Sequence, residues 1–219
     1  MNEPKVKKHR LISFRYLFFD IAKVTGAIPM LIWFRPKLLY ENEQAKKLIR
    51  GGALLMANHI NMLDPISVQV SVGYRRHHFV CMKELLNTKL KRLVFTGFHC
   101  IPIDREHFGM DSFRTITGHL ECGDIVSIFP EGRIHQEDAA AFAEFKSGII
   151  LMALKGKAPI IPIYTKPRKH WYERTVTVIG ERIDVEKLIG QRPSMARISE
   201  VAELLRNKES ELKSISEKG

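Results

Sequence analysis

From residue 51 onward, short apolar runs alternate with longer segments in which apolar residues recur every three or four positions. The short runs, bounded by turn residues, predict β-strands, and the longer period predicts helices. The predicted strands are ALLMAN (53–58), HHFVCM (77–82), HCIPIDR (99–105), DIVSIFP (124–130), APIIPIYT (158–165) and RTVTVIG (174–180). The predicted helices span 64–72, 84–95, 108–121 and 145–155. A last amphipathic helix, marked by Met195, Ile198, Val201, Ala202 and Leu205, precedes a charged tail that we expect to be solvated.

This alternation is typical of a single α/β domain with a mixed, largely parallel sheet flanked by helices. Helical crossovers of this length favour parallel pairing, whereas the loop between 165 and 174 is too short for a helical crossover and predicts an antiparallel pair. Pro159 and Pro162 place the strand 158–165 at an edge or a bulge. Ligands of such folds bind beyond the carboxyl ends of the parallel strands, so polar residues at those ends are candidates for function.

The amino-terminal segment is the most apolar part of the chain. A helical face is formed by Phe14, Leu17, Phe18, Ile21 and Val24, with Arg15, Asp20 and Lys23 on the opposite side. We expect Gly26 and Pro29 to break this amphipathic helix before a second apolar piece, MLIWF, at 30–34. The longest uncharged run, 24–34, is shorter than the ~20 residues that a spanning helix needs, so a simple transmembrane span is not expected.

Two interpretations of this segment remain: contact with a membrane surface, or packing against its own domain. The aromatic residues beside a Lys-rich lead-in favour membrane contact. The sequence therefore predicts a membrane-association segment at 1–35 and a catalytic or binding α/β domain at 36–219.

The charge balance restricts the partners. The 219 residues carry a formal charge of +11, which suits nucleic acid, an anionic bilayer or a phosphorylated substrate. Nucleic acid is disfavoured, because no recognisable binding module is present and the basic residues are not interleaved with aromatic ones. Three cysteines without metal-ligand spacing indicate reduced thiols and a cytoplasmic environment. We therefore expect a protein associated with the cytoplasmic face of an anionic membrane.

The stretch NHINMLD, 58–64, places His59 at the end of a predicted strand and Asp64 five residues later. Asp64 followed by Pro65 has the form of a helix N-cap and first helical residue. Capping leaves His59 unexplained, because an imidazole at the exit of a buried strand needs a partner or a task. A carboxylate that accepts from Nδ1–H would leave Nε2 free as a general base, and this base would act on a hydroxyl of the substrate, because no G-x-S-x-G nucleophile motif is present.

Three further stretches end predicted strands. IPIDR, 101–105, delivers Arg105; FPEGR, 129–133, delivers Glu131, Gly132 and Arg133; and APIIPI occupies 158–163. Together with NHINMLD, in this order, they resemble the glycerolipid acyltransferase family over roughly residues 51–165.

The resemblance implies roles for these residues. His59 would be the general base toward a glycerol hydroxyl, and Asp64 would orient it. Arg105 would bind the acceptor phosphate, and Glu131 with Gly132 would belong to the acceptor-binding motif. Two departures from the family pattern are His99, where glycine is frequent, and Arg133, which follows Gly132 without the threonine that many members interpose.

The expected activity is transfer of a fatty acyl chain from acyl-CoA or acyl carrier protein to the free hydroxyl of 1-acylglycerol-3-phosphate, giving phosphatidic acid. Arg133 and Lys146 are further candidates for phosphate or coenzyme contact. No cofactor is expected, and no metal site is expected at His77 and His78, because neighbouring strand residues point to opposite faces. The alternatives are another lysolipid acceptor, such as a lyso-ornithine lipid, and a non-enzymatic protein that binds anionic membranes.

Overall fold

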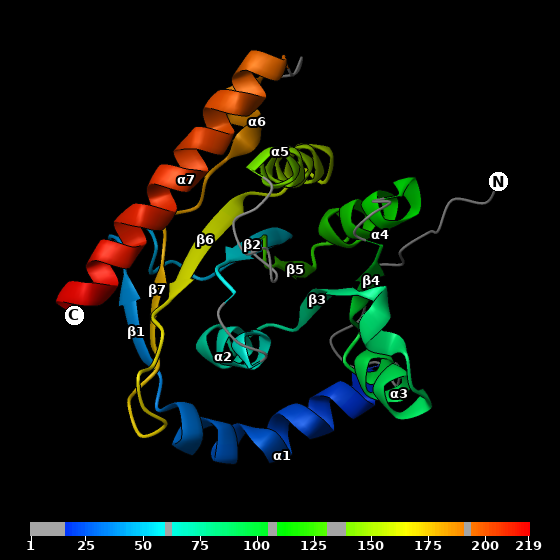
Figure 1. Ribbon diagram of the computed structural model, residues 1–219, viewed down its shortest axis with the longest axis vertical. Coiled ribbons are helices and arrows are strands. Elements are labelled where there is room, and N and C mark those ends of the chain that lie inside the picture. Colours follow the sequence, from blue (N-terminus) through cyan, green and yellow to red (C-terminus); the bar gives the residue numbers. More distant parts are fainter. Residues whose placement is uncertain (1–15, 60–62, 105–108, 131–138, 191–193) are drawn as a thin grey trace.

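The computed structural model describes residues 16–59, 63–104, 109–130, 139–190 and 194–219, and of 139–146 it describes the backbone alone. One seven-stranded sheet organises the chain (Figure 1). Its strands are β1 (Lys37–Tyr40), β2 (Ala53–Ala57), β3 (His77–Met82), β4 (Ile101–Ile103), β5 (Ile125–Ile128), β6 (Ile160–Thr165) and β7 (Val176–Ile179). The helices are α1 (Leu17–Phe34), α2 (Asp64–Ser71), η2 (Lys83–Leu86), α3 (Lys89–Gly97), α4 (Met110–Glu121), α5 (Ala139–Lys155), α6 (Val185–Ile189) and α7 (Met195–Lys218).

The sheet is mixed and largely parallel, as predicted. Its order is β1-β7-β6-β2-β5-β3-β4, and β6 with β7 forms the antiparallel pair. β2 lies parallel to both β5 and β6, and β3 lies parallel to β4 and β5. All six predicted strands are present, and β1 was missed because its four residues are too few to show a period. The carboxyl ends of β2, β3, β4, β5 and β6 therefore lie together at one end of the sheet, called its carboxyl edge below; the opposite end is called its amino edge.

The proline-containing strand β6 is not an edge strand, because β2 and β7 flank it. The regular pairing of β6 with β7 covers only Ile163–Thr165, and beyond it the Gly180 N–H donates to the Pro162 carbonyl over 2.9 Å. The Pro162 nitrogen therefore lies on the β7 side of the strand, where the regular ladder of hydrogen bonds has already ended. The missing N–H of Pro162 removes no hydrogen bond of that ladder. A side chain at Gly180 would place its Cβ only 2.7 Å from Pro162 Cγ, which explains the glycine.

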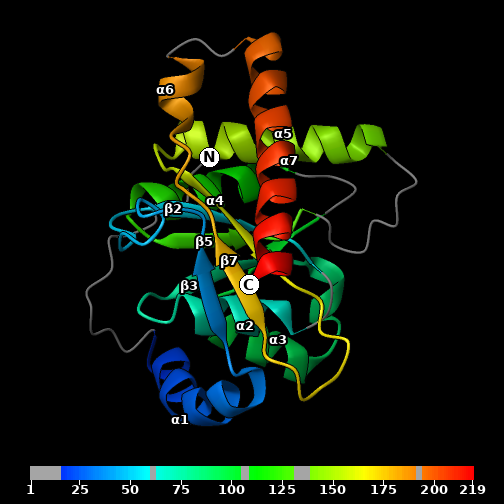
Figure 2. The same cartoon turned by 90° about the vertical axis from the view of Figure 1, so that its left-hand side faces the viewer.

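Two apolar layers cover the sheet because its side chains alternate between the faces. On β2, Leu54 and Met56 join the large core beneath α4, α5, α6 and α7, whereas Ala53, Leu55 and Ala57 join the core beneath α2. Helix α1 contacts α2 on the second face, and Figure 2 shows α1 at the bottom of the view below α2, while α7 runs down its middle. The domain is therefore a three-layer arrangement with α1 outside the α2 layer.

Helix α1 is continuous, so the predicted break at Gly26 and Pro29 is wrong. Pro29 lies inside the helix, and Figure 1 shows that α1 is bent. A proline removes one backbone hydrogen bond but allows the helix to continue with a bend when the flanking turns hold. By length and composition α1, with 18 residues of mean hydropathy 1.6, could also cross a membrane, although a single such helix is weak evidence for a span.

The side of α1 that faces the domain is only partly apolar. Tyr16 and Phe19 are buried, and Asp20 receives two hydrogen bonds of 2.6 and 2.7 Å from Arg76. The Arg76 guanidinium holds the pKa of Asp20 below its usual value, so this ion pair persists at neutral pH. The opposite, apolar side remains exposed, with Val24 at 72% and Ile28 at 67%. The sequence pattern identified the helix, and the structure shows that its apolar face points away from the domain.

Helix α7 corrects the expectation of a solvated tail. It continues to Lys218, and Leu212 in its second half is fully buried against Tyr164 of β6 and Val178 of β7. Lys208 of α7 pairs with Glu41 over 2.5 Å. The apolar positions in this stretch are too widely spaced among charges to identify the buried face from sequence alone.

Candidate active site

His59 and Asp64 lie together at the carboxyl end of β2. The Nδ1 atom of His59 is 2.9 Å from Oδ2 of Asp64. Asp64 is the first residue of α2 and Leu63 occupies the N-cap position, so the predicted N-cap role of Asp64 is wrong. The Asp64 carboxylate instead contacts the imidazole of His59.

The environments of the two groups differ. The Asp64 side chain is 3% exposed, whereas the His59 side chain is 27% exposed. A buried carboxylate that accepts from Nδ1–H fixes the imidazole tautomer and leaves the Nε2 lone pair on the other side of the ring. The geometry is that of a positioned base with access to solvent or substrate.

Aromatic rings support one side of the imidazole. The Phe129 ring centroid lies 5.0 Å from that of His59, and Phe79 of β3 stacks on Phe129 at 6.4 Å. Phe129 belongs to the FPEGR stretch, so this stretch contacts the NHINMLD stretch through His59. This apolar wall excludes water from one face of the base.

Asn58 holds the strand end that carries His59. Its Nδ2 donates to the Thr165 carbonyl over 2.9 Å, and the Thr165 N–H donates to Asn58 Oδ1 over 2.7 Å. The side chain is buried, so each bond forms away from solvent. The sequence analysis overlooked Asn58, although a polar residue at the end of an otherwise apolar strand is a detectable signal.

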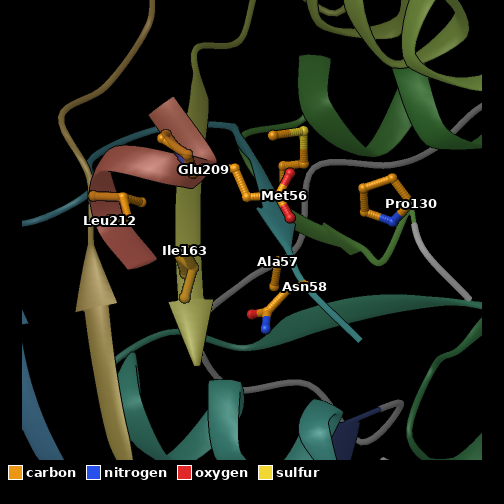
Figure 3. A pocket seen from close by; sticks show the side chains of 8 residues that line it. Met56, Ala57, Asn58, Pro130, Ile163, Glu209 and Leu212 are labelled. Atoms are coloured by element: carbon orange, nitrogen blue, oxygen red, sulfur yellow. The ribbon is translucent and has the colours of Figure 1, made fainter. Parts of the chain in front are cut away.

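A pocket lies at the same edge of the sheet (Figure 3). It is lined by Met56, Ala57 and Asn58 of the β2 region, Pro130, Pro162, Ile163, Glu209 and Leu212. Figure 3 shows that Glu209 and Leu212 come from α7, on the side of the pocket opposite Pro130. The predicted solvated tail thus supplies part of the wall beside the candidate site.

Comparison with known proteins assigns the family. The model of the family described as Acyltransferase matches residues 38–166, which is more than half of the chain and includes His59, Asp64 and the strand ends around them. The chain belongs to the acyltransferase family.

Two individual proteins agree with this assignment. The chain is 29% identical over 167 residues to a Bacillus subtilis protein named 1-acyl-sn-glycerol-3-phosphate acyltransferase, covering 74% of this chain and 81% of the relative. A crystal structure of the 1-acyl-sn-glycerophosphate acyltransferase PlsC from Thermotoga maritima matches with a TM-score of 0.54 over 90% of this chain and 82% of that one. At 14% identity, the structural match supports the α/β fold.

The remaining predicted site residues of this acyltransferase lie in segments that follow strands. Arg105, Glu131, Gly132 and Arg133 fall outside the described residues, and Lys146 lies in α5. The last described residues before them are Asp104, which directly follows β4, and Pro130, two residues after β5. Both points are on the edge that carries His59.

A cation that the sequence analysis did not consider lies at this edge. Lys83 follows β3 directly, and its Nζ atom is 3.8 Å from Oδ2 of Asp104. The side chain is 57% exposed, so it can also reach an anionic ligand. The charge pattern could not identify Lys83, because only the pairing of β3 with β4 brings it next to Asp104.

The departure at His99 has a conformational explanation. His99 has φ of 54°, in the left-handed region that glycine adopts with the least strain. The residue precedes β4, at the amino ends of the parallel strands. It is therefore at the edge opposite His59, and this departure does not bear on the acceptor.

The Asn58 contacts generate a prediction. Asn58→Ala leaves the buried N–H and carbonyl of Thr165 without their partners, at about 1–3 kcal/mol for each unsatisfied group. We expect thermal or chemical denaturation to show a loss of about 2–6 kcal/mol in unfolding free energy, with lower acyltransferase turnover. The matched control is Thr165→Val, because Thr165 Oγ1 has no hydrogen-bond partner among the described residues. Equal stability of Asn58→Ala and wild type would contradict the role of this contact.

Proposed function

We propose that this acyltransferase moves a fatty acyl chain from acyl-CoA or acyl carrier protein to the free hydroxyl of 1-acylglycerol-3-phosphate, giving phosphatidic acid for phospholipid synthesis. The observation that carries the proposal is the 2.9 Å contact between Nδ1 of His59 and the buried Asp64 carboxylate, inside the matched family region. The printed name of the Bacillus subtilis relative supports the acceptor.

His59 performs the proton transfers in this proposal. Nε2 takes the proton of the acceptor hydroxyl while its oxygen forms a bond to the thioester carbonyl carbon. The tetrahedral intermediate then breaks the carbon–sulfur bond, and the proton on Nε2 passes to the departing thiolate. Asp64 stabilises the imidazolium between the two steps. The reaction balances without a cofactor.

The acceptor phosphate is assigned to the residues that follow β4 and β5. Arg105 can meet a phosphate with two parallel hydrogen bonds, and Arg133 and Lys146 supply further positive charge to acceptor or donor. Glu131 and Gly132 complete the acceptor-binding segment. Lys83 reinforces the positive field because it projects from the same edge.

We also propose that the segment 1–35 docks the enzyme on an anionic bilayer at the cytoplasmic face, where acyl-CoA and acyl carrier protein occur. The exposed apolar face of α1 supports this, because an uncovered apolar surface of this kind is stable in contact with acyl chains. Trp33 stacks on Trp171 at 6.2 Å, and Trp171 is 72% exposed. Tryptophan is favoured at the boundary between headgroups and acyl chains, so the β6–β7 loop extends the docking surface.

The role of His59 is tested by kinetics. His59→Ala should lower kcat by roughly 100-fold or more, the usual contribution of a positioned general base, with an unchanged circular dichroism spectrum. Asp64→Asn should lower kcat as well, because an amide cannot stabilise the imidazolium. The assay supplies labelled acyl-CoA or acyl carrier protein with a panel of lysolipids. A folded His59→Ala enzyme with normal turnover would remove the mechanism, and wild type inactive on every acceptor would favour a membrane-binding function.

The acceptor is tested through Arg105. Loss of a charged hydrogen bond costs about 1.5–3 kcal/mol, so Arg105→Ala should lower kcat/KM for 1-acylglycerol-3-phosphate by about 10- to 100-fold. Arg105→Lys should be intermediate, and Arg197→Ala, at an arginine that bonds the Leu188 carbonyl, serves as the control. The measured quantity is the ratio of kcat/KM for this acceptor to that for a lysolipid without a terminal phosphate. An unchanged ratio would show that Arg105 does not bind the phosphate.

Membrane docking is tested on the exposed face of α1. The double change Val24→Asp and Ile28→Asp should reduce flotation with phosphatidylglycerol-containing vesicles at least about 10-fold, because two apolar side chains no longer enter the bilayer. The fold should persist, since both side chains are mostly exposed. Leu188→Asp on α6, at a site 40% exposed, is the matched control. Unchanged flotation of the double variant would place the docking surface elsewhere.

A further inference from the structure

A cluster of two histidines and one aspartate lies at the edge of the sheet opposite His59. It consists of His78 of β3, His119 of α4 and Asp124 in the turn before β5. One nitrogen or oxygen atom of each side chain lies within 4.8 Å of those of the other two. The pairing of β3 with β5 and the packing of α4 on β5 bring the three residues together.

We propose that His78, His119 and Asp124 bind a zinc ion that joins β3, α4 and the turn before β5. The distances from Oδ2 of Asp124 are 2.9 Å to Nδ1 of His119 and 3.6 Å to Nε2 of His78. Zinc ligands at ~2.0–2.1 Å in a tetrahedron are separated by about 3.3 Å, so both Asp124 distances lie within about 0.4 Å of this value. The rings of His78 and His119 lie with their centroids 4.0 Å apart, so the two rings must turn apart for both nitrogens to bind the ion.

The orientation of His78 is that of a metal ligand. Its Nδ1 is 3.2 Å from the His99 carbonyl, which accepts Nδ1–H and fixes the tautomer with the Nε2 lone pair toward Asp124. A backbone carbonyl behind a histidine is the usual outer partner in zinc sites.

His119 and Asp124 provide the other two ligands. Without a cation, Nδ1–H of His119 donates to Asp124; with zinc, the ring takes its Nε2–H tautomer and Nδ1 binds the ion, with no change in net protonation. Asp124 contributes one negative charge and is 21% exposed, which leaves a water access to the fourth position. The nearby Arg76 is paired with its own counter-ion, Asp20, over 2.6 Å.

The donor set selects the metal. Two imidazoles and one carboxylate suit zinc, whereas magnesium and calcium require six or more ligands that are mostly oxygen atoms. The site lies at the amino ends of β3 and β5, away from the candidate base, so the ion is structural and takes no part in acyl transfer. The sequence analysis considered His78 only with its neighbour His77; the ligands come instead from residues about 40 positions later in the chain.

The site predicts zinc-dependent stability. The full-length protein is stripped with a chelator, dialysed against zinc and assayed for metal per chain by mass spectrometry. We expect one zinc that is lost in His119→Gln and in Asp124→Asn, with affinity lowered at least about 10-fold in each. At 100-fold excess of free zinc over its Kd, the melting temperature of wild type should rise by about 5–10 °C, and that of each variant by at most about half as much.

Controls separate this site from other histidines. His170→Gln, on an exposed loop, and His59→Ala should both retain the zinc and its stabilising effect. If His119→Gln does not fold, Asp124→Asn and the melting of wild type with and without chelator still decide the matter. Zinc retained by both cluster variants, or no zinc bound by wild type, would overturn the proposal and leave the cluster as a hydrogen-bonded network.

Discussion

Parallel pairing of β2 with β5 on one side and β6 on the other is the constraint on which the rest of the structure depends. It aligns the carboxyl ends of strands that are far apart in sequence, so His59, Phe129 and Thr165 meet at one edge. Parallel strands need long crossovers, and the helices that provide them cover both faces of the sheet. The polar groups of the candidate site therefore lie at the rim of an apolar core. Asp64 and Asn58 are buried there, whereas His59 remains partly exposed.

The buried side chains of Asp64 and Asn58 at this rim have partners that offset the cost of removing them from water. Asp64 is almost fully buried and meets the His59 imidazole, and Asn58 exchanges two hydrogen bonds with the Thr165 backbone. Forming such a hydrogen bond adds little net stability, because it replaces a hydrogen bond to water, whereas removing one partner leaves the other buried and unsatisfied. The main effect of these contacts is to fix the positions of the two side chains. Their geometry defines where the base points, and the contact of His59 with Phe129 links it to the segment assigned to the acceptor.

The two edges of the sheet carry different chemistry. The carboxyl edge holds the base, the pocket and Lys83, whereas the amino edge holds the cluster around Asp124. The amino edge is also where Arg76 meets Asp20 of α1, so the helix assigned to the membrane is anchored beside that cluster. The outer face of α1 is apolar and exposed, because only the inner side of this helix contacts the domain.

The sequence by itself determined the elements and the candidate base. Local apolar periods predicted six strands and the α/β class. A histidine at the end of a strand, with an aspartate five residues later, predicted the pair of His59 and Asp64. Each of these signals lies within a few residues of the chain. Tertiary structure alone decided the continuity of α1 through Pro29, the burial of Leu212 and the partners of Asn58 and His78. These features depend on contacts between residues distant in the chain. No local pattern can show which strands become neighbours, and that choice determines what each side chain meets.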